Sequence, residues 1–441
     1  MSDAAAYPTI VALSSGSGRA GVAVIRISGS RVRFVLETIA GGIPEPRHAV
    51  LRQLRDEAGE VIDAGLVLYF PAPASFSGED IAEFQVHGAR AVIARLLNVL
   101  TQLPGVRLAE AGEFTRRAFE AGKLDLAAVE GLADLIDSET EWQRRQALRQ
   151  MTGTLGKQAA AWRGRLIEAM ALLAADIDFS DEGDVSGPLV DEALAIAAGI
   201  AGELRAALGG FAMGERVREG FVVVLAGPPN AGKSSLLNAL ARRDVAIVSA
   251  MAGTTRDAIE VRLDLGGLPV MLVDTAGLRE SADEIEAEGV RRALELVARA
   301  DLVLKLRAID SPPDRFASIQ KTLCIATKAD LASDLANQAL PGEIAVSSRT
   351  GAGLDELLAS IVAELGALSQ PEPALLTRER HRAAVSDAVL ALERAIDARH
   401  GQVELLAEEV RLAVTALERL VGRIDVEDVL DQLFSGFCIG K

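Results

Sequence analysis

The sequence predicts a multidomain protein of α/β and all-α parts: an N-terminal α+β domain, a discontinuous helical domain, and a parallel α/β domain inserted into it. A chain of 441 residues exceeds what one hydrophobic core usually covers. The residue pattern also changes along the chain, from short β-branched runs to long helical stretches and then to strands alternating with helices. Helical patterns return after the alternating region, which an insertion explains most simply.

Residues 1–121 are expected to form the α+β domain. Short runs rich in β-branched residues ("TIVAL", "GVAVIRIS", "AGLVLYF", "IAEFQVHG") alternate there with helix-like stretches such as "RAVIARLLNVLTQL". Runs of this length bounded by glycine and polar residues are typical of strands.

Residues 122–218 are expected to be the first part of the helical domain. Ala, Leu, Glu and Arg recur at helical spacing, as in "AAAWRGRLIEAMALLAADI". Residues 219–372 then alternate strands ("FVVVLAG", "LPVMLVDTAG", "DLVLKLR", "TLCIATKAD") with helices, the pattern of a parallel sheet. After the proline-containing "SQPEPALLTRER", residues 373–441 return to helix as the second part of that domain.

Composition indicates a cytoplasmic protein without a membrane span. The apolar runs are strand-sized, and the N-terminus lacks a basic region followed by an apolar one. The two cysteines, Cys324 and Cys438, argue against a disulfide framework, and we expect Cys324 to lie in the core. A net charge of −17 opposes indiscriminate binding to nucleic acid, so any RNA contact must be local.

The stretch "GPPNAGKSS" from Gly227 matches the phosphate-binding loop pattern G-x-x-x-x-G-K-[ST], between an apolar strand and a helix-forming run. Backbone N–H groups would hold the phosphates, Lys233 would neutralise the β and γ oxygens, and Ser234 would ligate Mg²⁺. The loop residues expected at the nucleotide are Asn230, Ala231, Gly232, Lys233, Ser234 and Ser235.

Two further motifs complete the pattern of a switch GTPase. "DTAG" follows a strand, so Asp274 can hold a water of the magnesium ion and the N–H of Gly277 can reach the γ-phosphate. "GTTRD" lies between the two phosphate motifs, where the first switch belongs, and Thr255 is the natural second Mg²⁺ ligand, although the motif alone could be a polar turn. The expected contacts are Gly253, Thr254, Thr255, Asp274, Thr275, Ala276 and Gly277.

Guanine is the base that the sequence favours. Asp330 in "TKAD" would accept hydrogen bonds from guanine N1 and N2, a donor pair that adenine lacks. GTPases usually carry asparagine where this chain has Thr327, so we expect weaker affinity without lost specificity. The base-binding residues expected from "TKAD" and "SSR" are Thr327, Lys328, Asp330, Ser347, Ser348 and Arg349.

The hydrolytic residue is not the usual glutamine, because apolar Leu278 follows "DTAG". Asn230, together with carbonyl groups of "SAMAGT", could hold a monovalent cation against the phosphates and supply the charge of an arginine finger. The acidic run "ESADEIEAE" is the place to seek a carboxylate that orients water, although most of its members are expected to be solvated helix surface.

These motifs, together with the terminal "FCIGK", resemble the MnmE (TrmE) family of tRNA modification GTPases. "TIVALSSGSGRAGVAVIRISG", "SFSGEDIAEFQVHG" and "GEFTRRAFEAGKLDLAAVEGLADLI" are similar to its N-terminal domain and first helix, so the resemblance covers essentially the whole chain.

The resemblance implies a folate-binding and dimerising N-terminal domain, a discontinuous helical domain and an inserted Ras-like P-loop G domain. It implies a homodimer that acts with an FAD-dependent MnmG-type flavoprotein, as a heterotetramer. Together they would add an aminomethyl or carboxymethylaminomethyl group to C5 of the wobble uridine of certain tRNAs. The implied cofactors are K⁺, Mg²⁺ and 5-formyl- or methylene-tetrahydrofolate, with GTP as substrate.

Family roles carry over residue by residue. The resemblance assigns K⁺ to Asn230, Ser249, Met251 and Thr254, and the water-orienting carboxylate to Glu286. It assigns folate to Arg26, Glu83, Lys123 and Lys441, each of which the sequence alone would treat as an ordinary surface charge. Cys438 is a candidate for covalent chemistry, with a buried small hydrophobe as the alternative.

Two other functions stay open at this stage. A regulatory GTPase of ribosome or tRNA metabolism would need only the nucleotide motifs, and a scaffold could hold a flavoprotein and tRNA while GTP sets its conformation. "FCIGK" and the folate-like N-terminal domain weigh against the first. The chain also departs from the family at Thr327 and in the strand "DLVLKLRAID", where Lys305 and Arg307 stand among apolar residues, so packing there is expected to differ.

Overall fold

The computed structural model describes residues 8–16, 18–178, 188–247, 260–274, 297–312, 321–331, 339–366, 373–400, 402–424, 427–437 and 439–440. The chain forms two compact units. The first comprises Met1–Ala133, Gly156–Ala161 and Leu417–Lys441, and the second comprises Asp134–Leu155 and Trp162–Ala416.

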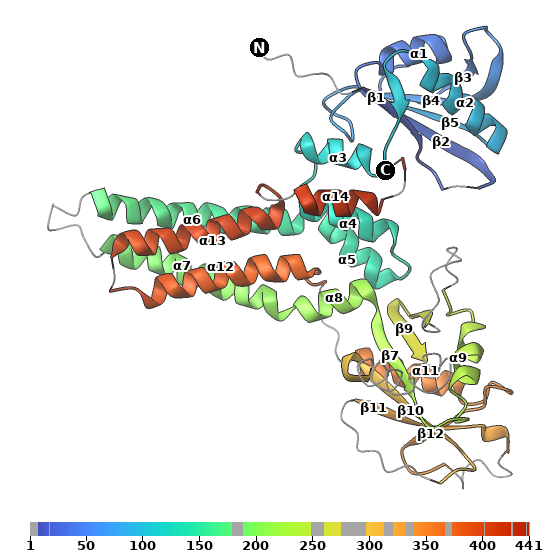
Figure 1. Ribbon diagram of the computed structural model, residues 1–441, viewed down its shortest axis with the longest axis vertical. Helices are drawn as coiled ribbons and strands as arrows, with labels where there is room; N and C mark the ends of the chain where they lie inside the picture. Colours follow the sequence, from blue (N-terminus) through green and yellow to red (C-terminus); the bar gives the residue numbers. More distant parts are fainter. Residues whose placement is uncertain are drawn as a thin grey trace, which may run out of the picture. The chain divides into compact units, whose positions relative to one another are not determined.

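The first unit is built on a six-stranded sheet of order β3-β4-β5-β2-β1-β6 (Figure 1). The β-branched runs become its strands, which are β1 Thr9–Leu13, β2 Ala20–Ser28, β3 Val50–Arg55, β4 Val61–Phe70, β5 Ile81–Gly88 and β6 Val106–Leu108. Neighbouring strands are antiparallel except β1 and β6, which are parallel.

Alternation of side chains gives this sheet two different faces. Helices α1 (Val32–Ala40) and α2 (Arg90–Gln102) share a core with one face, into which Ile25 and Ile27 point. On the other face Ile10 packs with Phe114 of α3 (Glu113–Glu120). The residues between the buried ones, including Arg26, therefore lie on the α3 side of the sheet.

The C-terminal helix α14 (Glu427–Ser435) belongs to the same unit. Phe434 and Phe437 form a core with Val129 of α4 (Leu126–Ile136). Gly112, with φ of 67°, begins α3 against the Phe434 ring, and a Cβ there would lie 2.8 Å from that ring. A side chain at position 112 is therefore excluded by both backbone and space.

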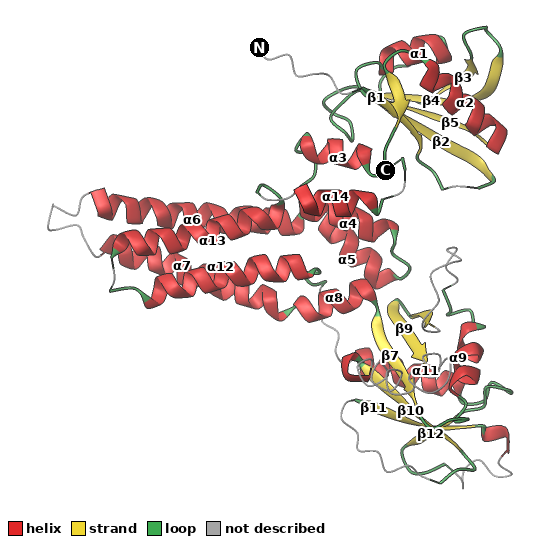
Figure 2. Ribbon diagram, in the orientation of Figure 1, coloured by secondary structure: helices red, strands yellow, loops and turns green. Residues whose placement is uncertain are grey.

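The predicted helical domain forms helices, which Figure 2 draws red like the other helices of the chain. Those of the second unit are α5 Glu141–Met151, α7 Pro188–Gly209, α8 Phe211–Glu219 and α12 Glu379–Asp397, whereas α6 Thr154–Asp178 and α13 Val403–Val421 each contribute residues to both units. Polar side chains join neighbouring helices: the Trp162 indole donates to Glu203 (2.8 Å), and Arg205 pairs with Glu393 (2.6 Å). These contacts link α6 to α7 and α7 to α12.

Among the described residues, one helical stretch, Pro188–Glu219, is long and apolar enough to cross a membrane by length and composition alone. Core helices of water-soluble proteins meet the same criterion. α7 buries seven side chains, as such a core helix does. The stretch is therefore weak evidence for a membrane span.

The inserted α/β region lies between α8 and α12 and has a sheet of order β12-β11-β10-β7-β9-β8 (Figure 1). Its strands are β7 Phe221–Ala226, β8 Glu260–Leu265, β9 Leu268–Asp274, β10 Leu302–Ala308, β11 Thr322–Thr327 and β12 Glu343–Ala345. Helices α9 (Lys233–Ala241) and α11 (Leu354–Gly366) share the main core with one face.

We expected the strands of this sheet to be parallel, and the expectation is wrong at one edge, where β8 runs antiparallel to β9. The two strands form a hairpin whose connecting residues, Gly266 and Gly267, have φ of 69° and 95°. Two consecutive positive φ values make the tight turn that matches the twist of paired strands, and glycine adopts them without strain.

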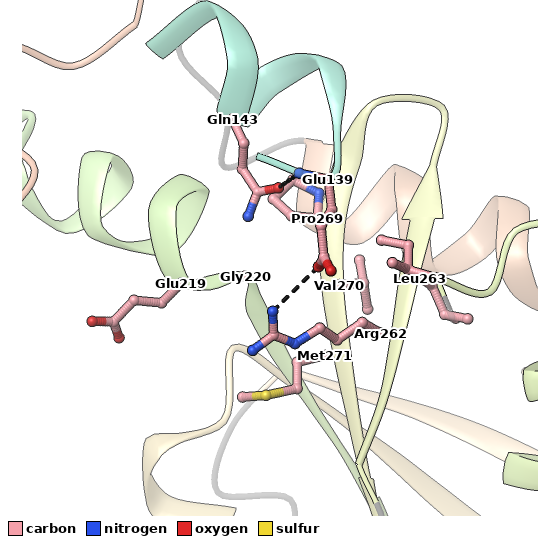
Figure 3. A pocket seen from close by; sticks show the side chains of 10 residues that line it. Glu139, Gln143, Glu219, Gly220, Arg262, Leu263, Pro269, Val270 and Met271 are labelled. Atoms are coloured by element: carbon pink, nitrogen blue, oxygen red, sulfur yellow. Dashed lines mark hydrogen bonds and ion pairs between the residues drawn. The ribbon is translucent and has the colours of Figure 1, made fainter. Parts of the chain in front are cut away.

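Helix α5 packs on this hairpin (Figure 3). The backbone N–H of Trp142 donates to the carbonyl of Gly267 (3.2 Å), and Arg262 of β8 pairs with Glu139 (3.2 Å). Gln143 and Met271 are among the residues that line a small pocket of about 10 Å³, which has room for one water molecule.

Candidate functional site

The segment from Gly227 to Gly232 leaves β7 and ends where α9 begins, so the backbone N–H groups at the start of α9 face the loop. Gly227 is required there, because a Cβ would lie 2.4 Å from the Leu306 carbonyl oxygen. Asn230 has φ of 63° and is one of three described non-glycine residues with positive φ. This strained loop conformation is what a phosphate cradle uses.

Hydrogen bonds to neighbouring protein groups hold the charged and hydroxyl side chains of the loop. The Lys233 ammonium donates to the carbonyl oxygens of Gly227 (2.9 Å) and Pro228 (3.0 Å), across the mouth of the loop. The Ser234 hydroxyl donates to Asp274 at the end of β9 (2.6 Å). A hydroxyl and a carboxylate adjacent to a phosphate cradle fit Mg²⁺ and one of its waters, because this ion prefers oxygen ligands and phosphates and keeps several waters.

A cavity of about 500 Å³ adjoins the loop and is lined by the expected base-binding residues except Ser347. The Ser347 hydroxyl donates to one oxygen of Asp330 (2.7 Å), and Arg349 lies 2.8 Å from the other. The hydrogen bond from Ser347 is the largest of the effects that hold the pKa of Asp330 below its usual value. The carboxylate is thus ionised and oriented for a donor pair. The lining residues are Gly232, Ser235, Asn238, Ala239, Arg242, Thr327, Lys328, Asp330, Leu331, Ser348 and Arg349.

Thr327, which stands where GTPases usually carry asparagine, contacts the phosphate loop through its hydroxyl. The Thr327 hydroxyl is buried and lies 2.6 Å from the carbonyl oxygen of Ala231, within the loop. It also lies 3.1 Å from the carbonyl oxygen of Arg307. The shorter contact identifies Ala231 as the acceptor, so this hydroxyl braces the loop.

Several expected site residues lie outside the described residues, and their roles stay predictions. They are Ser249, Met251, Gly253, Thr254, Thr255, Thr275, Ala276, Gly277, Glu286, Cys438 and Lys441.

In the first unit the structure brings Arg26 and Glu83 together. They face one another on β2 and β5, and Arg26 Nη2 lies 2.8 Å from the Glu83 carboxylate. Both side chains are partly exposed, and the guanidinium lies within 6 Å of the ring centres of Phe76 (5.6 Å) and Phe114 (5.9 Å). Aromatic rings beside an accessible carboxylate and guanidinium fit a flat heterocycle with a guanidine-like edge.

Lys123 and the C-terminal segment lie close to the same side of the unit. The Lys123 side chain approaches Gly78, in the loop that carries Phe76. Ile439 forms a bridge with Ala111, and the Ser14 hydroxyl donates to the carbonyl of Gly440 (2.7 Å). The C-terminal segment is thus held against the ends of β1 and β6.

Three features of the α/β region were not expected from the sequence. Asn238 and Arg242 line the base cavity. The sequence signal that could have identified them is their spacing of four residues, which places both on one face at the C-terminal end of α9. Arg307 is buried and pairs with Glu343 (2.6 Å), which explains the charge in an apolar strand. Cys324, expected in the core, is only partly buried.

The Arg307–Glu343 pair is ionised. The hydrogen bond that Arg307 donates to Glu343 raises the pKa of Arg307. Burial opposes ionisation of Glu343, yet hydrogen bonds from Arg307 and from the N–H of Leu340 hold the Glu343 pKa below its usual value.

Two family models match the chain. Residues 9–123 match the N-terminus of the GTP-binding protein TrmE, and residues 126–438 match the MnmE helical domain.

Proteins named tRNA modification GTPase MnmE are similar along their whole length. The one from Methylorubrum populi is 55% identical over 438 residues, covering 98% of this chain and 98% of that protein. The one from Beijerinckia indica is 52% identical, covering 100% of this chain and 98% of that protein. Among solved structures, the G domain of the T. maritima FeoB iron transporter is 28% identical over 33% of this chain and 98% of that one, with a TM-score of 0.25.

Proposed function

The chain belongs to the MnmE family of tRNA modification GTPases, and from this premise we propose that it is a K⁺-stimulated GTPase that modifies C5 of the wobble uridine of certain tRNAs. Family membership makes the chain a GTP hydrolase. The observation that carries the proposal is that the phosphate loop and Asp330, whose carboxylate Ser347 orients, line one cavity in a chain that matches these relatives over 98% of its length.

GTP binding would exchange contacts that the loop now makes with itself. Lys233 would release the carbonyls of Gly227 and Pro228 and hold the β and γ phosphate oxygens. Ser234, with Thr255, would hold Mg²⁺, and Asp274 would hold a water of that ion; the ion offsets negative charge on the phosphates. Asp330 would exchange Arg349 for the N1–H and N2–H of guanine.

Hydrolysis would use K⁺ and a carboxylate in place of an arginine finger and a glutamine. Asn230, with Ser249, Met251 and Thr254, would hold K⁺ beside the phosphates. Glu286 would orient the water whose oxygen attacks the γ-phosphorus while the bond to the bridging oxygen breaks, giving GDP and phosphate. Two G domains of a homodimer would meet across their switches to order these residues.

For modification of the uridine, the first unit would bind the folate. Arg26, Glu83, Lys123 and Lys441 would hold a 5-formyl- or methylene-tetrahydrofolate, which supplies the one-carbon unit. Arg26 and Glu83 lie side by side, with the Arg26 guanidinium near the rings of Phe76 and Phe114, which supports this assignment. An FAD-dependent MnmG-type flavoprotein would complete the reaction in a heterotetramer, and Cys438 is the candidate for a covalent contribution.

Nucleoside analysis of wobble uridines tests the proposal. Cells whose own gene is replaced by one encoding Glu83→Gln should lose the aminomethyl and carboxymethylaminomethyl groups while the purified variant still hydrolyses GTP. Glu393→Gln, on the exposed surface of α12, is the matched control and should leave the uridines modified. Unchanged uridines in cells without the protein would refute a role in this modification.

An assay of one-carbon transfer distinguishes a catalytic role of this protein from a scaffold role. Radiolabelled transfer from the folate to tRNA should be lost in Cys438→Ser if the thiol acts covalently, and should persist if Cys438 is structural.

A further inference from the structure

Arg307 reaches across a whole strand of the second sheet. It lies on β10 on the face opposite α9 and α11, and its guanidinium pairs with Glu343 of β12 through Nε–Oε1 (3.0 Å) and Nη2–Oε2 (2.6 Å). Strand β11 lies between β10 and β12. In register with Arg307, β11 and β12 carry Ala326 and Ala345, whose small side chains leave room for the crossing.

The same guanidinium closes the turn that follows β10. Arg307 Nη1 donates to the carbonyls of Ile309 (3.2 Å) and Ser311 (2.7 Å). The N–H of Ile309 donates in turn to the carbonyl of Thr327 (2.9 Å), and the Thr327 hydroxyl lies 3.1 Å from the Arg307 carbonyl. Thr327 is therefore held at its backbone carbonyl by the turn that the Arg307 guanidinium closes.

Glu343 acts on the other guanine-reading segment. Its carboxylate also accepts from the N–H of Leu340 (2.9 Å), which fixes the entry to β12. Strand β12 leads within two residues to Ser347, whose hydroxyl donates to Asp330. The bridge thus anchors the strands and turns from which both segments of the base pocket extend.

We propose that Arg307 and Glu343 are a positioning pair for guanine recognition, which compensates in this chain for the threonine at position 327. A threonine hydroxyl donates one hydrogen bond, whereas an asparagine amide donates two, so Thr327 orients its own segment less completely. A buried, bidentate ion pair holds its geometry tightly because misalignment leaves buried charge unpaired. The inference rests on the proposed role of residues 327–330 as the base-reading segment.

Nucleotide affinity measured apart from turnover tests the pair. The Kd for a fluorescent GDP analogue should rise about tenfold in Arg307→Met and in Glu343→Gln. Glu343→Gln keeps the shape of the side chain, so it tests the pair even if Arg307→Met does not fold. Turnover at saturating GTP should stay within about twofold, because the pair touches neither water nor phosphate. Arg205→Met, which removes an exposed ion pair between α7 and α12, should change neither quantity.

Rescue by asparagine separates positioning from general support of the sheet. Thr327→Asn should tighten GDP binding more in the Arg307→Met background than in the wild type, because the amide supplies the orientation that the pair no longer gives. Equal gains in the two backgrounds, or wild-type affinity in both variants of the pair, would overturn the inference. So would a loss of turnover as large as the loss of affinity.

Asp330→Asn separates failure of this inference from failure of the base-pocket assignment. If that variant keeps the wild-type preference for GTP over ATP, the assignment itself is wrong. If it loses the preference while both pair variants bind GDP normally, the assignment stands and the positioning role is wrong.

Discussion

Thr327 is a single residue whose hydroxyl joins the base pocket to the phosphate loop, through the carbonyl of Ala231. Thr327→Val removes that hydrogen bond at nearly constant volume. It should lower the free energy of unfolding by about 1 kcal/mol and weaken GDP binding roughly fivefold. Denaturant melts and nucleotide titration would measure the two effects.

Thr327→Ser is the control for this prediction, since it keeps the hydroxyl and loses only a methyl group. If the valine variant binds GDP as the wild type does, the contact with Ala231 contributes nothing to the site.

Glu286 is predicted to orient the attacking water, a role that Leu278 cannot fill because its side chain accepts no hydrogen bond. Glu286→Ala should lower the GTP turnover number by about 10²-fold or more while leaving GTP affinity nearly unchanged. Single-turnover hydrolysis in saturating K⁺ would measure it. Glu284→Ala and Glu288→Ala are the matched controls, and normal turnover by Glu286→Ala would move the role to a neighbouring carboxylate.

Local chemistry decides which residues could be predicted from the sequence. Lys233 and Ser234 were predictable from one short motif and Asp274 from a second, because each motif directly follows a strand. The Arg307–Glu343 pair was not, since neither partner lies in a recognisable motif and the two meet only when the strands take a particular order. Arg26 and Glu83 likewise meet through strand pairing, so only resemblance singled them out.

At the scale of secondary structure elements, the bridge from β10 to β12 makes the sheet sensitive to acid. Glu343 has a folded-state pKa below its usual value, so its contribution to stability is complete above the unfolded-state pKa of about 4.3. That contribution is lost as the pH falls below this value and through the folded-state pKa.

The melting temperature of the wild type should therefore fall more steeply between neutral pH and about pH 3 than that of Glu343→Gln, which cannot ionise. The variant should be the less stable of the two at neutral pH, and the difference should narrow in acid. A constant difference across this range would show that ionisation of Glu343 contributes nothing to folding.

Strand positions were predicted better than strand directions. The segments at β7, β9, β10 and β11 were read as strands because they are short, mostly apolar runs that alternate with helix-like stretches. β8 was missed because its run, "EVRLDL", mixes charged and apolar residues, as an edge strand does. The Gly-Gly pair before β9 was the available signal for an antiparallel hairpin.

At the scale of the whole molecule, hydrolysis is expected to depend on the cation in solution. GTP turnover should be roughly tenfold or more faster in K⁺ than in Na⁺ at equal ionic strength, because in our proposal Asn230 helps to hold a cation of suitable radius that supplies the charge of an arginine finger. Steady-state rates across a series of chloride salts would measure this.

Asn230→Ala should abolish the difference between the two salts while nucleotide binding persists, since Lys233 and the backbone make most phosphate contacts. Equal rates of the wild type in K⁺ and Na⁺ would contradict the cation site.

The contact of Gly440 with Ser14 joins positions 426 residues apart in the chain, and this has a consequence during protein synthesis. At translation rates of about 5 to 20 residues per second, β1 leaves the ribosome about 20 to 85 seconds before its C-terminal partner exists. The nascent first unit must stay soluble through that interval with the surface around Ala111 and Ser14 uncovered. A ribosome that stalls within the last helix would release a chain able to bind GTP but lacking the segment that closes its first domain.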